Sequence, residues 1–531
     1  MLLITSGAYV DSELYAEFGK IPPAFLPVGN RRLFTWQAER HGARHAQVCM
    51  TVPGDFMLDE ADHGWLDAHN IALYRTEPGA ALGVAIHDFL SAHDVAGPID
   101  ILYGDTLIAD APREDSDWLA VGHTDEYYHW YHELPAHGQP GGTWSGMFAF
   151  SDARKLRALL AERGDFIASV LAYDRDVAAL AHWQVAGWLD FGHVHTDFES
   201  KRTVTTQRHF NQLRVTDGVV TKTGDDPAKI AAEAQWFEQA PAAIKPFLAP
   251  YIGRTAPSAG HGGGYQLEYL HLATLNELYV FGRLPARVWG RIFRACDAFL
   301  QAARAVPVEQ PPAFDTLHQA YRDKTLARLD AYAAASGCNL DAPWTLNGQP
   351  APSLRAIAAH ASAAVEAGAP EPSFLHGDFC FSNILFDFRA GRVKTIDPRG
   401  LDAGGRPACF GDLRYDVGKL GHSVLGLYDH IVAGHYVLET DAADAQALRF
   451  RVLADRTRPI QELFLATPFA GRLPGAWACL PVMVLLFLSM LPLHADSPAR
   501  QRALMANAIR LYLDWRAHDR HSDGGTEPPL L

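Results

Sequence analysis

Short apolar runs alternate with amphipathic stretches along the first two hundred residues. Residues 2–4, 46–52 and 99–106 have the length and apolar character of β-strands, and the stretches that follow residues 29 and 83 have the spacing of helices. Strands that alternate with helices predict a parallel sheet with crossover helices. Ligands of such sheets bind beyond the carboxyl ends of the strands. Asp105 stands at one predicted strand end, and a second acid, Asp190, follows in residues 187–192.

The pattern changes to hairpins after residue 205. Residues 211–223 hold two β-rich segments around an Asp-Gly pair, which is a strong hairpin signal. A helix is predicted to begin at Asp226, the N-cap, with proline at its first position. Lys222 near the end of the second strand and Glu233 two turns into the helix can form the ion pair that orients the α- and β-phosphates of ATP in kinases. The plainer alternative is a solvated lysine. Residues 265–272 are expected to be a further strand, and residues 255–264 a loop before it.

Helical spacing dominates from about residue 285. Residues 288–304, 314–335 and 353–367 carry apolar side chains at intervals of three and four. The most apolar run, residues 476–491, is shorter than the roughly 20 residues that span a bilayer, so we expect a buried core helix. The polar residues after 521 are expected to be disordered.

One stretch in this helical part, residues 374–397, carries the densest set of chemical groups. A loop holding His376, Asp378 and Asn383 is followed by two arms of equal length around a turn at Gly391, so the predicted hairpin returns Asp397 to the side of Asn383. Phosphoryl transfer uses this set: one carboxylate orients the attacking hydroxyl and accepts its proton, and an Asn with an Asp holds Mg²⁺ on the triphosphate. The alternative is a polar loop before an ordinary hairpin.

The motif His-Gly-Asp-x-x-x-x-Asn at 376–383, followed by Ile-Asp at 396–397, resembles the catalytic segment of the aminoglycoside phosphotransferase and choline kinase family. The resemblance implies a bilobal protein-kinase-like (α+β) fold that uses ATP and Mg²⁺. Asp378 matches the catalytic base, and Asn383 and Asp397 match the metal ligands. Residues 411–420 resemble the family's Gly-Asp-Pro-x-Tyr-Asp helix start, with leucine in place of proline at 413. Asp416 in this segment either braces the catalytic loop or caps a helix.

The N-terminal part resembles the sugar-1-phosphate nucleotidyltransferases over residues 1–205. Residues 22–28 are similar to their Pro-Lys-x-Leu-x-Pro-Val segment, and Gly-Asp at 104–105 and Trp-Leu-Asp at 188–190 match their two metal sites. The resemblance implies an α/β, doubly wound, Rossmann-like domain that binds a second NTP, with Mg²⁺ on Asp105 and Asp190. Two features depart from the family. The loop after the first strand, from Gly7, carries acids where phosphates would be bound, and Pro23 replaces the family's lysine, for which Lys20 is a nearby substitute.

Length, charge and cysteine content limit the number of domains, the kinds of partner and the cellular compartment that we expect. The chain has 531 residues, which suggests several domains. A net charge of −15 without a basic run argues against nucleic acid and against an anionic membrane surface. Six scattered cysteines without paired spacing favour reduced thiols, and with no signal peptide evident we expect a cytoplasmic protein.

The sequence therefore predicts a bifunctional enzyme built from a nucleotidyltransferase-like domain (1–205), a kinase N-lobe (206–284), a mostly helical C-lobe (285–520) and a tail (521–531). The kinase would phosphorylate a hydroxyl of a small molecule, a sugar or an amino alcohol, and the N-terminal domain would join the product to a nucleotide. Surface polysaccharide precursors are the expected destination. The first alternative is an active kinase whose N-terminal domain only binds a nucleotide or a partner; the second is a scaffold without catalysis. The acceptor, the base of the second nucleotide and the oligomeric state are left open.

Overall fold

The computed structural model describes residues 1–110, 113–124, 142–204, 211–256, 263–309 and 321–522. Parts of the expected loop at 255–264 and of the expected helix at 314–335, and the tail from 523 to 531, lie outside these residues. The chain divides into two compact units: residues 1–206 with 281–284, and residues 207–280 with 285–531. We refer to them as unit 1 and unit 2.

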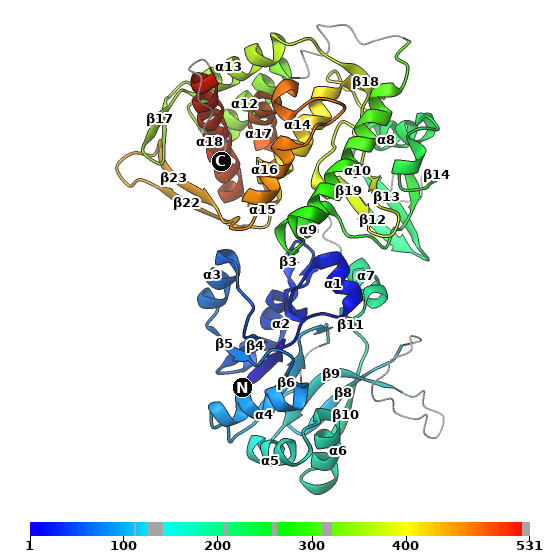
Figure 1. Cartoon of the computed structure of the whole chain (residues 1–531), viewed down its shortest axis with the longest axis vertical. Coiled ribbons are helices and arrows are strands. Elements are labelled where there is room, and N and C mark those ends of the chain that lie inside the picture. The colour runs from blue at the N-terminus through cyan, green and yellow to red at the C-terminus, as the bar shows by residue number, and fades with distance from the viewer. Residues whose placement is uncertain (111–112, 125–141, 205–210, 257–262, 310–320, 523–531) are drawn as a thin grey trace. The chain divides into compact units, whose positions relative to one another are not determined.

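Unit 1 is built on a seven-stranded sheet with the order β10-β8-β9-β6-β1-β4-β5 (Figure 1). The strands β1, β4, β5 and β6 pair in parallel, which confirms the expected α/β class. The sheet is mixed and not purely parallel, because β9 runs antiparallel to both β6 and β8. The strand bounds are β1 Leu2–Thr5, β4 Val48–Pro53, β5 Ile71–Thr76, β6 Ile99–Tyr103, β8 Trp118–Gly122, β9 Thr143–Phe150 and β10 Ala181–Val185.

Helices cover both faces of this sheet because side chains alternate along its buried strands. On β1, Leu3 joins a core with α4 (Leu82–Ala92), α5 (Ala153–Arg163) and α6 (Phe166–Asp176), which Figure 1 shows gathered along one face. Leu2 and Ile4 join the opposite core with α2 (Leu33–His41) and α3 (Glu60–Ala68). The remaining elements of unit 1 are α1 Ser12–Phe18, α7 Val194–Thr203, the pair β2 Pro27–Val28 with β3 Arg31–Arg32, and the pair β7 Thr106–Ile108 with β11 Trp188–Asp190.

A short piece from the middle of the chain completes unit 1. Residues 281–284, which the sequence analysis placed at the end of the range 206–284, belong here. The guanidinium of Arg32 donates a 2.7 Å hydrogen bond to the carbonyl of Phe281, and the N–H of Arg283 donates one of 2.7 Å to the carbonyl of Phe18. These two bonds join residues 281–284 to β3 and α1 of unit 1.

Unit 2 begins with a four-stranded antiparallel sheet of order β12-β13-β15-β14 and one helix, α8. The predicted hairpin is β12 Asn211–Thr216 with β13 Val219–Gly224, and the predicted helix is α8 Pro227–Gln239 with Asp226 as its N-cap. The other strands are β14 Tyr251–Thr255 and β15 Gly264–Glu268. Trp236 of α8 donates a 2.8 Å hydrogen bond to the carbonyl of Leu375, so this helix is fixed to the chain directly before His376.

The rest of unit 2 is packed around α17 (Cys479–Met490), whose described side chains are almost all buried, as expected for a core helix. Among the helices in the described residues, none combines the length and the apolar character that a membrane crossing needs. Figure 1 shows α17 amid α12, α13, α14 and α18. The helix bounds are α9 Leu275–Val280, α10 Ala286–Ala305, α12 Arg322–Ser336, α13 Leu354–Glu366, α14 Leu413–Val424, α15 Tyr428–Val432, α16 Arg458–Ala466 and α18 Pro498–Ser522.

Several strands also occur in this part, where the apolar spacing predicted mostly helices. One sheet has the order β17-β16-β23-β22, with β16 Trp344–Leu346, β17 Gln349–Ala351, β22 Tyr436–Thr440 and β23 Ala447–Val452. Its central pairing joins Thr345 to Ala447, a long-range contact that local patterns do not report. Two smaller pairs flank residues 375–383: β18 Pro372–Phe374 with β21 Phe410–Asp412, and the predicted hairpin, β19 Ile384–Asp387 with β20 Arg392–Thr395.

Candidate active sites

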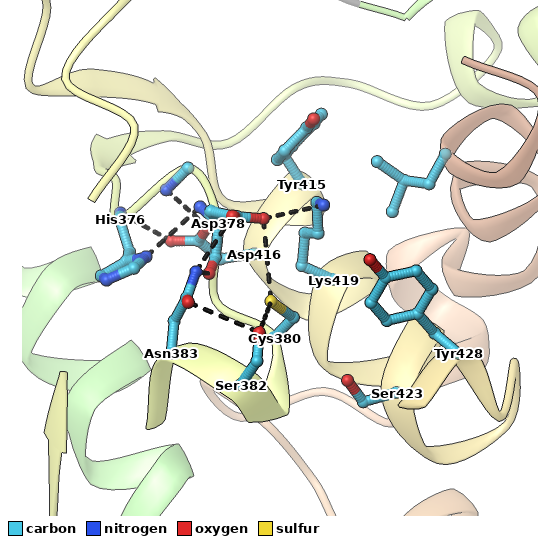
Figure 2. A network of polar contacts seen from close by, with 12 residues as sticks. His376, Asp378, Cys380, Ser382, Asn383, Tyr415, Asp416, Lys419, Ser423 and Tyr428 are labelled. Carbon is cyan, nitrogen blue, oxygen red and sulfur yellow. Dashed lines mark hydrogen bonds and ion pairs between the residues drawn. The ribbon is translucent and has the colours of Figure 1, made fainter. Parts of the chain in front are cut away.

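The carboxylate of Asp378 lies between an amide and an ammonium group. The Nδ2 of Asn383 donates a 3.0 Å hydrogen bond to Oδ2 of Asp378, and the Nζ of Lys419 lies 2.8 Å from its Oδ1. Figure 2 shows these two partners approaching the carboxylate from opposite sides. Burial lowers the pKa of Lys419, but its interactions with Asp378, Tyr415 and Cys380 together outweigh burial, and the net shift is upward. Lys419 therefore stays charged and holds Asp378 in one orientation.

Asp416 fixes the backbone of this loop. Its carboxylate accepts hydrogen bonds of 2.8 Å from the N–H groups of both His376 and Gly377. Gly377 has a φ of +77°, a conformation that glycine adopts without strain. The cap of α14 is Asp412, which accepts from the N–H of Arg414. Of the two expectations for Asp416, the loop brace is therefore confirmed. Burial raises its pKa to about 7, against the effect of the two N–H groups.

Lys222 connects the first sheet of unit 2, which contains β13, to the end of the β19–β20 hairpin. The Nζ of Lys222, on β13, lies 2.7 Å from Oε2 of Glu233 on α8 and 3.1 Å from Oδ1 of Asp397. Lys222 and Glu233 are both buried, and the hydroxyl of Tyr265 donates a 2.9 Å hydrogen bond to the same Oε2. Burial lowers the pKa of Lys222, but Asp397 and Glu233 outweigh it and raise the pKa overall. The ion pair expected from the sequence is thus present.

Asn383 and Asp397 meet as the hairpin pattern predicts. The N–H of Ile396 donates a 3.0 Å hydrogen bond to the carbonyl of Asn383, which places Asp397 next to it. Asp397 has a φ of +55°, a left-handed conformation that is strained for a residue with a Cβ and is typical of functional sites. Both side chains offer oxygen atoms, the donors that Mg²⁺ prefers, and Mg²⁺ bound to a triphosphate needs only one or two carboxylates from the protein. The residues therefore fit a metal held jointly with the phosphates.

Lys419 was not predicted from the sequence, although residues 411–420 had been singled out. It lies three residues after Asp416 on α14, so both side chains lie on neighbouring positions of one helix surface. A basic residue at that spacing from an acid in the motif was the available signal. It was weak, because a lysine in a helix is usually solvated.

Unit 1 brings together the two acids that were expected to bind metal. A Cβ placed on Gly192 would lie 2.7 Å from Oδ2 of Asp105 and 3.2 Å from Oδ1 of Asp190, so both carboxylates flank this glycine. Burial, and then the charge of Asp190, raise the pKa of Asp105 to about 7. Asp190 is oriented by the hydroxyl of Thr196 at 2.7 Å and by the N–H of Gly192 at 2.9 Å. Two close carboxylates fit a divalent cation, which would relieve the repulsion that contributes to the raised pKa of Asp105.

No cluster of three or more His, Cys, Asp or Glu side chains arranged to hold a metal ion occurs within the described residues of either unit. Each proposed Mg²⁺ position thus consists of two protein side chains, and the remaining ligands would be phosphate oxygens and water.

The other two predicted binding residues of unit 1 have structural partners of their own. The carbonyl of Gly7 accepts a 2.7 Å hydrogen bond from the hydroxyl of Thr76. A Cβ on Gly7 would lie 2.7 Å from Cγ2 of Thr76, so any residue other than glycine would require Thr76 or the loop to move. The Nζ of Lys20 lies 2.6 Å from the carboxylate of Asp55 on the surface. Asp11, one of the unexpected acids of this loop, accepts from the first N–H groups of α1 as its N-cap.

One family model matches part of unit 2. Residues 220–425 match the model of the phosphotransferase enzyme family, which confirms the resemblance found in the C-terminal part. Comparison with the curated proteins gives no match.

Solved structures similar to the chain include a nucleoside-diphosphate-sugar pyrophosphorylase from Vibrio cholerae RC9, at 15% identity and a TM-score of 0.31, covering 38% of this chain and 100% of that one. An inositol-1-phosphate CTP transferase from T. maritima has 11% identity and a TM-score of 0.30, covering 38% and 95%. An apo UDP-glucose pyrophosphorylase has 13% identity and a TM-score of 0.29, covering 38% and 97%.

Proposed function

We propose that the chain is a bifunctional enzyme that phosphorylates a small molecule in unit 2 and joins the phosphorylated product to a nucleotide in unit 1. The observation that carries the proposal is the convergence of Lys222, Asp378, Asn383 and Asp397, which come from one strand and one loop-hairpin segment. A fused pair of activities also keeps the intermediate at a high local concentration. Activated precursors of surface polysaccharides are the proposed products.

In unit 2 the acceptor hydroxyl attacks the γ-phosphorus of ATP. The bond between the γ-phosphorus and the β,γ-bridging oxygen breaks, ADP leaves, and the hydroxyl proton passes to Asp378. Lys222, held by Glu233 at 2.7 Å, would contact the α- and β-phosphates. Mg²⁺ on Asn383 and Asp397 would neutralise charge on the phosphates. Lys419 would keep the Asp378 carboxylate aimed at the hydroxyl.

In unit 1 a phosphate oxygen of that product attacks the α-phosphorus of a second NTP. The bond from the α-phosphorus to the α,β-bridging oxygen breaks, and pyrophosphate leaves. Asp105 and Asp190 would hold the Mg²⁺ that offsets the charge on the phosphates. Gly7 would allow the loop after β1 to approach the triphosphate closely, and Lys20 would have to exchange Asp55 for a phosphate.

The test supplies purified full-length protein with Mg²⁺, ATP and each of CTP, UTP, GTP and dTTP. Free sugars, amino alcohols and their monophosphates serve as acceptors, and ADP and pyrophosphate are followed together. We expect ADP from a free acceptor and pyrophosphate from its monophosphate. Protein that releases neither product and does not bind MgATP would contradict the proposal.

The second candidate function is a small-molecule kinase whose unit 1 only binds a nucleotide or a partner. Two observations favour it: Lys20 is engaged by Asp55, and Asp11 occupies the loop where phosphates would be bound. The same assay separates the two functions, because this enzyme would release ADP and no pyrophosphate with every monophosphate and NTP.

A further inference from the structure

A group of basic side chains lies around Tyr415, which is on the same helix as Lys419 and four residues before it. Lys324 and Arg328 are four residues apart on α12, Lys419 lies on α14, and Arg399 follows the hairpin. We call these four residues the cation cluster. Tyr415 is its centre: the Nζ of Lys324 donates a 2.8 Å hydrogen bond to the hydroxyl of Tyr415, and the guanidinium of Arg399 lies 5.8 Å from the Tyr415 ring centroid.

The members of the cation cluster act on one another electrostatically. Burial, together with the charges of Arg399 and Arg328, outweighs the raising effect of Tyr415 and lowers the pKa of Lys324 to about 8. Burial alone would raise the pKa of Tyr415, but Lys324, Arg399 and Lys419 outweigh it and lower the pKa to about 7. Positive charge is thus concentrated at one place in a chain whose net charge is −15.

Carboxylates are scarce around this concentration, and the ionised phenolic oxygen of Tyr415 would compensate only one of the four cations. Within the described part of the chain no carboxylate forms an ion pair with Lys324, Arg328 or Arg399, and only Lys419 has one, with Asp378. Arg328 donates to the carbonyl of Ser489 at 3.0 Å, and Arg399 to that of Asp402 at 3.4 Å. A carbonyl carries only a partial charge. Lys324, Arg328 and Arg399 are half-buried like charges without a carboxylate partner among the described residues. Such an arrangement costs stability, and a bound anion would relieve the repulsion.

The position of the cation cluster indicates whether it binds the acceptor or the nucleotide. Lys419 contacts Asp378 and is at the same time one of the cations that act on Tyr415, so the cluster begins where the acceptor hydroxyl must lie. Figure 2 shows Tyr415 and Lys419 together on α14 beside the Asp378 carboxylate. The triphosphate side of the site is marked instead by Lys222 and Asp397, on the sheet and the hairpin.

We propose that the acceptor of unit 2 is an anionic hydroxyl compound, whose carboxylate or phosphate group binds to Lys324, Arg328 and Arg399 while its hydroxyl faces Asp378. The inference rests on the proposed kinase function and narrows its acceptor. A free amino alcohol carries a positive charge that the cation cluster would repel, and a neutral sugar would leave the charges uncompensated. The shared chemistry is a carboxylate or a phosphate monoester, and the experiment separates the two.

The experiment measures ADP release by the full-length protein with related acceptors that carry a neutral, a carboxylate or a phosphate group. Glycerol, glycerate and glycerol phosphate form one series, glucose, glucuronate and glucose 6-phosphate a second, and ethanolamine is the cationic member. We expect turnover with an anionic acceptor, and its KM should be at least about tenfold below that of the neutral acceptor of the same series. A hydrogen bond to a charged group changes the affinity by about this factor. A preference for carboxylate or for phosphate identifies the group.

Substitutions test whether Lys324 and Arg328 bind the anionic group of the acceptor. Lys324→Gln and Arg328→Gln should each raise the acceptor KM about tenfold or more and leave the KM for ATP unchanged. Arg322→Gln, on the same helix but paired with Asp323 and Glu366, is the matched control and should change neither. A neutral or cationic acceptor that is preferred by the wild type and unaffected by these variants would overturn the inference and leave the kinase intact.

A binding measurement covers the case in which no member of the panel is phosphorylated. Calorimetry with inorganic phosphate, at saturating ADP and Mg²⁺, should give a wild-type affinity about tenfold or more above that of the double variant with glutamine at 324 and 328. Equal affinities would overturn the inference. Failure to bind ADP or ATP at all would instead contradict the proposed kinase, so the two failures are distinguishable.

Discussion

At the scale of single residues, the site of unit 2 depends on side chains that hold one another in place. Asp378 is fixed by Asn383 and Lys419, and its backbone neighbours are fixed by Asp416. Precise placement of a proton acceptor matters more than its mere presence, because general base catalysis requires hydrogen-bond contact with the attacking hydroxyl. Substitutions here should therefore change the rate more than the affinity.

We expect Asp378→Asn to lower kcat for ADP formation by about 10²- to 10⁴-fold, the usual contribution of a general base. The amide keeps the shape of the side chain but cannot accept the proton. Steady-state kinetics with a fixed acceptor measures the loss, and Asp323→Asn, at an exposed acid of α12, is the control. Full turnover in Asp378→Asn would remove Asp378 from the reaction.

The Lys324–Tyr415 contact predicts a pH dependence of acceptor binding. The pKa of Lys324 is lowered to about 8 and that of Tyr415 to about 7, so the pair loses a proton as pH rises through this range. The positive charge that faces an anionic acceptor falls as this proton is lost. We expect the acceptor KM to rise from pH 6.5 to pH 9. The rise should vanish when Lys324→Gln and Tyr415→Phe are combined, and a flat wild-type profile would contradict the prediction.

At the scale of elements, local signals predicted local structure well. The hairpins β12–β13 and β19–β20 and the start of α8 follow from turn residues and an N-cap within a few positions of one another. The pairing of β16 with β23 and the antiparallel β9 depend on residues far apart in sequence. The same division holds in the site: Lys222, Glu233, Asn383 and Asp397 lie on recognisable elements. The cation cluster, by contrast, is assembled only when α12 packs near α14 and Arg399.

The crossing of α14 and α17 shows how closely two of these elements approach. A Cβ on Gly418 would lie 2.3 Å from Cγ1 of Val482, a buried and branched side chain that cannot move aside. Gly418→Ala should therefore lower the stability of unit 2 by about 1–3 kcal/mol, the usual cost of overpacking a core. Urea denaturation of the full chain measures the change.

Two comparisons make this prediction specific. Gly475→Ala, where a Cβ would meet nothing within 4 Å, should leave the denaturation midpoint nearly unchanged. Val482→Ala combined with Gly418→Ala should recover part of the loss relative to the sum of the single variants, because the removed methyls make room for the new one. Strict additivity of the two substitutions would exclude the steric explanation.

At the scale of the whole molecule, the two proposed reactions should respond to separate substitutions. We expect Asp105→Asn to abolish pyrophosphate release while ADP formation continues at the wild-type rate, because Asp105 and Asp190 lie in unit 1 and Asp378 in unit 2. Asp378→Asn should do the reverse when a ready-made monophosphate is supplied. Measuring both products in each variant is the test, and loss of both activities in either one would contradict independent sites.

The piece at 281–284 has a consequence for how this gene can be divided. The chain passes between the units at 206–207, again at 280–281 and again at 284–285. A gene fragment that stops at codon 206 would encode Arg32 without the Phe281 carbonyl that its buried guanidinium contacts at 2.7 Å. A fragment that begins at codon 207 keeps the whole of unit 2, whereas no single cut releases the whole of unit 1 free of residues 207–280. A shortened gene for unit 1 would need codons 281–284 joined to the first fragment.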